Sequence, residues 1–208
     1  MLDVGCGTGG FAREIARVTG ARVVGCDRSE RFLEFARALP SDVTWVEANA
    51  EQLPFEAERF DRVLHSLVLH QLADPTAAVA EAFRVLRPGG LVLVRTIAPE
   101  DMAERVPERY LPAMARADEA RLPAIDAICG WLRESGFGEV DVRRHLRNKT
   151  LNPAEQEQEL RTEARYRYPF LTDEEIDGAV EQIRRDAAAA GEWVDPRPTY
   201  LILGLKPS

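Results

Sequence analysis

The chain has 208 residues, which suits one domain, and its 45% hydrophobic and 30% charged residues are ordinary for a globular protein with a buried core. A formal net charge of -8 disfavours the broad basic surface that nucleic-acid binding needs, so no nucleic-acid partner is expected. The sequence has neither an apolar run long enough for a membrane span nor a visible signal peptide, and we therefore expect a cytoplasmic protein. Three cysteines without a CxxC pair favour a reducing compartment, and no metal site is predicted.

The first half of the chain alternates short apolar strands with amphipathic helices. The expected strands are at Val4 and at residues 21–27, 43–48, 60–67 and 91–96. Helices fill the intervals. Ser29 is placed to cap the second helix, and Asp74 with Pro75 marks the start of the third, which stops at residues 88–90. This alternation predicts a parallel sheet covered by helices on both faces.

The second half is less regular. Residues 98–120 contain three prolines and are expected to be irregular or short-helical. The other expected elements are a helix at 122–135 with Gly136 as its C-cap, and strands at 139–145 and 199–206. The residues between these two strands look helical. Thr172 and Glu175 form a capping box there, and Gly191 is expected to end the helix that follows.

The chain opens with a glycine-rich stretch, MLDVGCGTGG, between a strand and a helix. Such a turn brings backbone N–H groups and a helix N-terminus to one point, where a ligand can bind. Gly5, Gly7 and Gly10 match the dinucleotide pattern G-x-G-x-x-G, and Asp27 follows at the distance of a ribose-binding acid. Together with Gly9, the first two also match G-x-G-x-G, so the glycines alone do not decide the ligand.

Asp3 distinguishes between the candidate ligands. A carboxylate beside a pyrophosphate would repel it, whereas S-adenosylmethionine (SAM) has an ammonium group, a cationic sulfonium and a ribose but no phosphate. The local chemistry therefore favours SAM. The alternative is that Asp3 only accepts hydrogen bonds from backbone N–H groups of the turn, as short acids readily do.

Five stretches of the first 96 residues carry a family resemblance. They are LDVGCGTG, GCDRSE (25–30), ANAEQLPF (48–55), FDRVLHSLVLHQLAD (60–74) and EAFRVLRPGG (81–90). In this order they resemble motif I, the ribose-binding acid, the adenine-binding stretch, the fourth strand with its loop, and the helix and turn before the fifth strand of class I SAM-dependent methyltransferases. The small-molecule branch of methyltransferase type 11, with the ubiquinone/menaquinone C-methyltransferases, is the most similar.

The resemblance implies a Rossmann-like three-layer α/β/α fold. Its mostly parallel seven-stranded sheet would have the order 3-2-1-4-5-7-6, with strand 7 antiparallel and a helical insertion between strands 6 and 7. One methyltransferase domain is expected over residues 1–208, with a SAM-binding half at 1–96 and substrate-side or lid segments at 97–120 and 146–198. The expected partner is a small-molecule acceptor, and the expected state a monomer or homodimer.

The resemblance also implies which residues bind the cofactor. SAM, or its product S-adenosylhomocysteine, is expected to bind through Asp3, Gly5, Cys6, Gly7, Thr8, Gly9, Asp27, Arg28, Asn49, Ala50, Glu51 and His65. Asp27 would bind the ribose hydroxyls, and Asn49, which replaces the usual Asp, would offer its carbonyl oxygen to the adenine amine. From the strand pattern alone, His65 looks instead like a satisfied core residue.

The sequence departs from the family pattern at its start. The family usually has a longer first strand and one or two helices before motif I, whereas Met1 lies two residues before Asp3. Three explanations stay open: the chain is truncated, its start is misassigned, or this member does without the segment. Because that segment often helps to cover the site, both SAM affinity and stability are expected to depend on which explanation holds.

Methyl transfer from a sulfonium is an in-line displacement with an excellent leaving group. The protein must therefore mainly align the reactants and exclude water. A general base is needed only if the acceptor loses a proton. His70, after the fourth strand, is the candidate base, and a local packing role is the alternative. His145, at the end of the sixth strand, is a weaker candidate.

The acceptor pocket is expected in the loops after the fifth and sixth strands. The second of these contains Arg161, Arg165, Tyr166, Arg167, Tyr168 and Phe170. This cluster would suit an acidic or aromatic acceptor, but the favoured interpretation is a solvated helix face with its aromatic rings turned inward.

Two other functions stay open. An NAD(P)-dependent oxidoreductase fits the glycines and Asp27 but leaves Asp3 and the later motifs unexplained. A non-catalytic SAM-binding or scaffold protein is compatible with Asn49 and with the short N-terminus.

Overall fold

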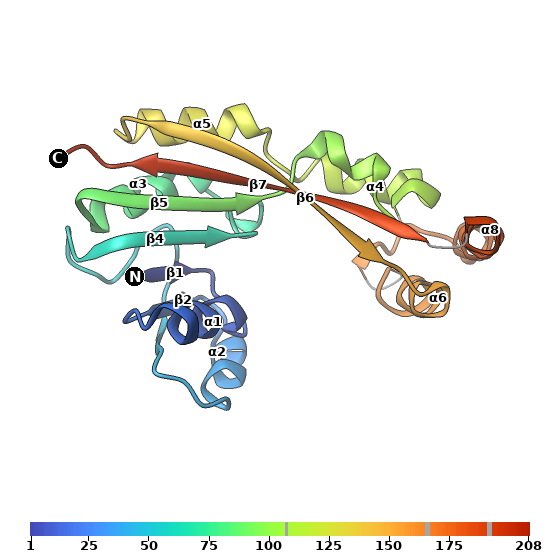
Figure 1. Cartoon of the computed structure of the whole chain (residues 1–208), viewed down its shortest axis with the longest axis horizontal. Coiled ribbons are helices and arrows are strands. Elements are labelled where there is room, and N and C mark those ends of the chain that lie inside the picture. The colour runs from blue at the N-terminus through green and yellow to red at the C-terminus, as the bar shows by residue number, and fades with distance from the viewer. Residues whose placement is uncertain (107, 165–166, 191–192) are drawn as a thin grey trace. The chain divides into compact units, whose positions relative to one another are not determined.

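The structure, a computed structural model, describes residues 1–106, 108–164, 167–190 and 193–208. Three predictions concern residues outside this description, namely Arg165 and Tyr166 in the Arg/Tyr cluster and Gly191 as a helix end. The chain forms two compact units (Figure 1). Unit 1 comprises Met1–Thr96, Ala124–Arg143 and Tyr200–Ser208, and unit 2 comprises Ile97–Pro123 and Arg144–Thr199.

Seven strands form a sheet in the order β3-β2-β1-β4-β5-β7-β6. The strands are β1 (Leu2–Val4), β2 (Val24–Asp27), β3 (Thr44–Glu47), β4 (Phe60–Ser66), β5 (Leu86–Thr96), β6 (Val140–Thr150) and β7 (Val194–Leu205). The pairs from β3 to β5 are parallel, whereas β7 pairs with β5 in the antiparallel direction. The predicted fold class, strand order and antiparallel seventh strand are confirmed.

Helices connect the strands. They are α1 (Gly10–Thr19), α2 (Glu30–Arg37), α3 (Pro75–Val85), α4 (Pro112–Glu119), α5 (Ile125–Glu134), α6 (Pro153–Glu159) and α8 (Asp173–Ala190), with short 3₁₀ or π turns η1 (Leu69–Gln71), η2 (Pro99–Glu104), η3 (Glu108–Tyr110) and η4 (Leu160–Ala164). Two predicted caps are confirmed: the Ser29 side chain accepts the N–H of Phe32, and Asp74 accepts that of Ala77. Among the described residues, no helix combines the length and apolar character needed to cross a membrane.

Several predicted boundaries are wrong, each for a local reason. Helix α3 ends at Val85, before the Pro-Gly-Gly turn, because β5 already begins at Leu86 and pairs with β4 through a register shift. Helix α5 begins at Ile125 and not at residue 122. Leu122 directly precedes Pro123, and the residue before a proline is disfavoured in a helical conformation. Strands β6 and β7 are longer than predicted, because charged residues and prolines hide the alternation in their unit 2 portions.

The core of unit 1 lies between the sheet and helices α3 and α5. It contains strand residues such as Val92, Val94 and Ile202 together with Val79 of α3 and Leu132 of α5, all of which are buried. Burying such a side chain contributes roughly 1.5–3 kcal/mol, which holds the two helices to this face. Figure 1 shows α1 and α2 beside β1 and β2, away from α3 and α5. The sheet thus has helices around it, as predicted.

Unit 2 has a separate apolar cluster. Its members include Met114 of α4, Leu160 of η4, Ile183 of α8 and Trp193. The predicted capping box before α8 is confirmed by the hydrogen bond from the Glu175 N–H to Thr172 Oγ1 (3.2 Å) and by the bond from the Thr172 N–H to Glu175 Oε2 (2.8 Å).

Candidate functional site

The glycine-rich turn joins β1 to α1. Gly5, Gly7 and Gly9 have φ angles of 71°, 54° and 78°, in the left-handed region that glycine adopts at little cost. Two of these positions are also crowded, since a Cβ at Gly5 would lie 2.4 Å from Val68 Cγ2 and one at Gly9 would lie 2.2 Å from the Trp45 ring. The turn therefore needs glycine both for its backbone conformation and for close packing.

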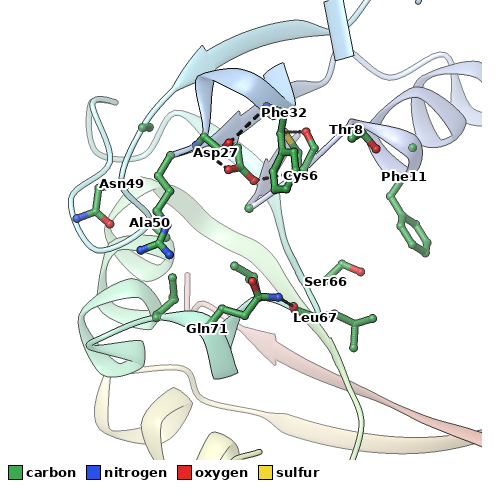
Figure 2. A pocket seen from close by; sticks show the side chains of 18 residues that line it. Cys6, Thr8, Phe11, Asp27, Phe32, Asn49, Ala50, Ser66, Leu67 and Gln71 are labelled. Atoms are coloured by element: carbon green, nitrogen blue, oxygen red, sulfur yellow. Dashed lines mark hydrogen bonds between the residues drawn. The ribbon is translucent and has the colours of Figure 1, made fainter. Parts of the chain in front are cut away.

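A pocket of about 760 Å³ opens beside this turn, where β1, β2 and β4 end (Figure 2). Parallel sheets bind ligands at this carboxyl edge. The lining residues are Gly5, Cys6, Gly7, Thr8, Gly10, Phe11, Asp27, Arg28, Ser29, Phe32, Ala48, Asn49, Ala50, Ser66, Leu67, Val68, Gln71 and Leu72. All of them belong to unit 1.

Most of the predicted cofactor residues line this pocket. They are Gly5, Cys6, Gly7, Thr8, Asp27, Arg28, Asn49 and Ala50. The pocket's lining residues do not include Asp3, Gly9, Glu51, His65 or the candidate base His70. Sequence reasoning missed the aromatic rings of Phe11 and Phe32 and the residues directly after β4, although a position just beyond a strand end was an available signal.

Asp27, at the end of β2, links the glycine turn to the next helix. Its Oδ2 accepts the N–H of Gly7 (2.8 Å), and its Oδ1 accepts the N–H of Ser29 (2.9 Å), as the dashed lines in Figure 2 show. A carboxylate has about four acceptor positions, so each oxygen keeps one for a hydroxyl group in the pocket. Asp27 can therefore support the turn and bind a ligand at the same time.

Asp3 is the most isolated charged group near the pocket. Its side chain is buried, and neither carboxylate oxygen has a hydrogen-bond partner among the described residues. Burial, and then the nearby charge of Asp27, raises the pKa of Asp3 to about 7. The alternative that Asp3 accepts N–H bonds from the turn is therefore wrong, because the N–H of Gly7 bonds to Asp27 instead. A buried carboxylate in this state is stabilised by a nearby cation.

Asn49 and Glu51 organise the segment after β3. Asn49 Oδ1, the oxygen predicted to meet the adenine amine, accepts the N–H of Glu51 (3.1 Å) and has a second acceptor position left. Glu51 Oε1 accepts the N–H groups of Ala73 and Asp74, both at 3.0 Å. Glu51 therefore anchors the start of α3, while Asn49 lines the pocket.

The segment after β4 forms another wall of the pocket. Leu67 has a φ of 56°, a backbone strain that costs roughly 1–3 kcal/mol in a residue other than glycine. Its N–H donates to the Arg95 carbonyl (2.9 Å), and its own carbonyl accepts a hydrogen bond from Gln71 Nε2 (3.0 Å). Figure 2 shows Leu67 and Gln71 joined in this way at the pocket. These two bonds hold the strained residue in place.

The three histidines occupy different environments. His65 is fully buried in β4, burial lowers its pKa to about 4, and neither ring nitrogen has a hydrogen-bond partner among the described residues. It is a core residue, as the strand pattern indicated, but not a satisfied one. His70 lies in η1, and its role as a base stays a prediction. His145 is exposed in the middle of β6, not at the end of that strand as expected.

The described part of the Arg/Tyr cluster is engaged within unit 2. Arg161 forms ion pairs with Glu157 (3.2 Å) and Asp177 (2.5 Å). The Tyr168 hydroxyl donates to the Asp118 carboxylate (2.8 Å), and the Tyr168 ring is buried. Arg161 and Tyr168 agree with the favoured interpretation of a solvated helix face with inward aromatic rings, whereas the Phe170 side chain is exposed and does not.

Comparisons with known proteins agree with this geometry. A family model described as a methyltransferase domain matches residues 2–94. Demethylmenaquinone methyltransferase of Clavibacter sepedonicus is 32% identical over 165 residues, which cover 69% of the chain and 67% of the relative. The ubiquinone/menaquinone biosynthesis C-methyltransferase UbiE of Paracoccus denitrificans is 32% identical over 169 residues, covering 69% and 68%. Malonyl-[acyl-carrier protein] O-methyltransferase of Serratia marcescens is 38% identical over 104 residues, covering 50% and 40%, so the chain spans about two thirds or less of these relatives.

Solved structures have the same fold. A protein of Bacillus halodurans C-125 superposes with a TM-score of 0.64 at 27% identity, over 100% of this chain and 92% of that one. Phosphoethanolamine N-methyltransferase 2 of Haemonchus contortus, in complex with SAM, superposes with a TM-score of 0.62 at 21% identity, over 100% of this chain and 48% of that one.

Proposed function

Because the chain belongs to the SAM-dependent methyltransferases, whose cofactor is SAM, we propose that it transfers a methyl group from SAM to a small-molecule acceptor. Its relatives include both C- and O-methyltransferases, so the acceptor atom is left open among O, N and C. Their names describe steps of small-molecule biosynthesis for the most part, which supports a small acceptor.

The observation that carries the proposal is the partnerless carboxylate of Asp3 behind a glycine-lined pocket. In low-dielectric surroundings its negative charge acts over several ångströms, so it favours a ligand with an ammonium and a sulfonium and disfavours a pyrophosphate. A Cβ at Gly7 or Gly10 would meet no atom within 4 Å, so the backbone there is open to the pocket and a ligand can lie against it. These features fit SAM better than NAD(P).

In this proposal, the residues of the pocket bind the cofactor and orient it toward the acceptor. SAM supplies an electrophilic methyl group on a good leaving group, and the protein must hold acceptor and cofactor in line. Asp27 binds the ribose hydroxyls, and Asn49 binds the adenine amine. Phe11 and Phe32 line the pocket with half-exposed rings that would shield a bound ligand from water.

The first test is calorimetric titration of the chain with S-adenosylhomocysteine, with NAD in parallel. Binding of S-adenosylhomocysteine alone supports the proposal. Binding of NAD alone would favour the oxidoreductase alternative. Binding of S-adenosylhomocysteine without turnover on a panel of phenol, amine and enol acceptors would favour the non-catalytic alternative.

Asp27→Ala should weaken S-adenosylhomocysteine binding by at least about tenfold, because two charge-assisted hydrogen bonds to the ribose are lost. Asp27 also supports the turn, so thermal unfolding of the variant is measured alongside. Asp74→Ala is the matched control, since it also removes a carboxylate that accepts a backbone N–H but does not line the pocket. An unchanged affinity in Asp27→Ala would refute the assigned role.

His70→Ala should lower turnover about 100-fold with little effect on S-adenosylhomocysteine affinity, if His70 removes the acceptor proton. The measurement is kcat on an acceptor found in the panel, together with calorimetric affinity. An equal loss of both would assign His70 to the structure of η1 instead.

A further inference from the structure

A second charged group lies at the far end of the pocket from Asn49. Arg95 is near the end of β5, and its carbonyl accepts the N–H of Leu67, which ties its position to the end of β4. Arg95 Nη1 donates to Ser66 Oγ (3.2 Å), and its guanidinium carbon lies 5.0 Å from the centre of the Phe11 ring. Both contacts line the pocket, and Figure 2 shows Ser66 and Phe11 on the side opposite Asn49. Arg95 itself is not a lining residue, so its guanidinium lies next to the pocket, in contact with two residues of the wall.

Arg95 has no acidic partner among the described residues. None of the ion pairs found there includes it. Burial lowers its pKa, and no neighbouring acid acts in the opposite direction. By contrast, Arg84 of the same unit is paired with Glu81. A partly buried guanidinium without a counter-ion is costly, and its planar donor fork matches a carboxylate.

We propose that Arg95, with Ser66 beside it, binds the carboxylate at the amino-acid end of the cofactor. This inference rests on the proposed function. The amino-acid end of SAM has an ammonium and a carboxylate on one carbon, so it needs both signs of charge nearby. Asp3 in β1 supplies the negative charge, and Arg95 in β5 supplies the positive one, with β4 between them in the sheet. The adenine then lies toward Asn49.

The test compares two ligands by calorimetry. S-adenosylhomocysteine has the amino-acid end, and 5′-methylthioadenosine has the same adenine, ribose and sulfur without it. Arg95→Gln should weaken the binding of S-adenosylhomocysteine by at least about tenfold and the binding of 5′-methylthioadenosine by less than about twofold. Arg95→Lys should keep part of the preference, because it retains the charge but not the fork. The control, Arg62→Gln, removes an exposed charge from β4 and should leave both affinities unchanged.

Several outcomes would overturn the inference. Equal weakening of both ligands by Arg95→Gln would make Arg95 a structural residue of the pocket wall. An unchanged ratio of the two affinities would exclude the cofactor carboxylate as the group that Arg95 binds, even if the variant lost turnover on an acidic acceptor. If Arg95→Gln does not fold, the ratio in Arg95→Lys decides in the same way. If the unaltered chain bound neither ligand, the proposed function itself would fail; if it bound both and only the variants disagreed, this inference alone would fail.

Discussion

The two units bury charged side chains in different ways. The buried acids of unit 2 have partners inside that unit: Asp195 with Arg197, Asp118 with Tyr168, Asp101 with Arg144, and Glu108 with Arg105 in an ion pair, although one oxygen each of Asp101 and Glu108 has no hydrogen-bond partner among the described residues. In unit 1, Asp3 and His65 are buried with no hydrogen-bond partner among the described residues. Buried polar groups are normally paired, so the pairs of unit 2 are explained by folding alone. The partnerless groups of unit 1 cost stability. The charge of Asp27, which lines the pocket, acts on Asp3, so a cationic ligand in the pocket would offset part of that cost.

Asp195→Ala should have the largest effect on stability. Asp195 accepts the N–H of Val106 (2.9 Å) and pairs with Arg197 (2.5 Å), so its removal leaves a buried donor and a guanidinium unpaired. We expect a loss of about 3–5 kcal/mol in the free energy of unfolding, measured in urea. Asp195→Asn, which keeps an acceptor for Val106, should lose less. A cost below about 1 kcal/mol would remove the contrast between the units.

Asp3→Asn should change the pH dependence of unit 1. The pKa of Asp3 is raised from 3.8 to about 7, so the folded state keeps a proton that the unfolded state releases. Its contribution is therefore fully present below about pH 4 and is lost as the pH rises through 7. Between pH 5 and pH 8 the contribution of Asp3 to the free energy of unfolding should fall by about 3 kcal/mol in the ligand-free protein, a decrease that the variant lacks.

The same variant tests the link with the cofactor. Because a ligand ammonium favours ionised Asp3, S-adenosylhomocysteine should bind more tightly as the pH rises through 7, with release of a proton. Asp3→Asn should abolish this dependence. Titrations in buffers of different ionisation enthalpy measure the proton directly, and a pH-independent affinity in the unaltered chain would contradict the role of Asp3.

His65→Leu should have a smaller effect of the opposite sign. The pKa of His65 is lowered to about 4, so the unfolded state takes up a proton below about pH 6.5 that the folded state does not. The histidine's contribution is fully present above pH 6.5 and is lost as the pH falls toward 4. At pH 5 the unaltered chain should have lost about 2 kcal/mol of the His65 contribution to its free energy of unfolding, and the variant should not show this loss. The variant should also keep its affinity for S-adenosylhomocysteine.

The contributions of Asp3 and His65 change stability in opposite directions with pH and largely cancel between pH 5 and pH 8. Each single variant should therefore show a steeper pH dependence of stability than the unaltered chain. The double variant should be nearly flat again. A double variant as steep as either single one would show that other groups govern the pH dependence.

The predictable part of the molecule is the part with local signals. Ser29, Asp74 and Thr172 are predictable as helix caps because each accepts a hydrogen bond from the backbone N–H three residues further along the chain. The glycine turn was recognisable because its φ angles are a property of the glycines themselves. By contrast, the unit 2 portion of β6 is rich in charged residues, and that of β7 contains prolines. Neither portion shows the alternation of apolar and polar residues that would predict a strand.

The candidate site was predictable to the same extent. The glycines and Asp27 predict the edge of the sheet where the pocket lies, and Asp3 together with the later family motifs favours SAM over NAD(P) as the cofactor. Sequence did not determine that Asp3 is without a partner, that Gly5 meets Val68, or that Arg95 meets Ser66 and Phe11. Each of these contacts joins residues that are far apart in the chain, and only the pairing of β1, β4 and β5 brings them together. The chain's own order determined which groups are present, and the tertiary structure decided which of them have a partner, because burial and charge pairing depend on neighbours that the local sequence does not contain.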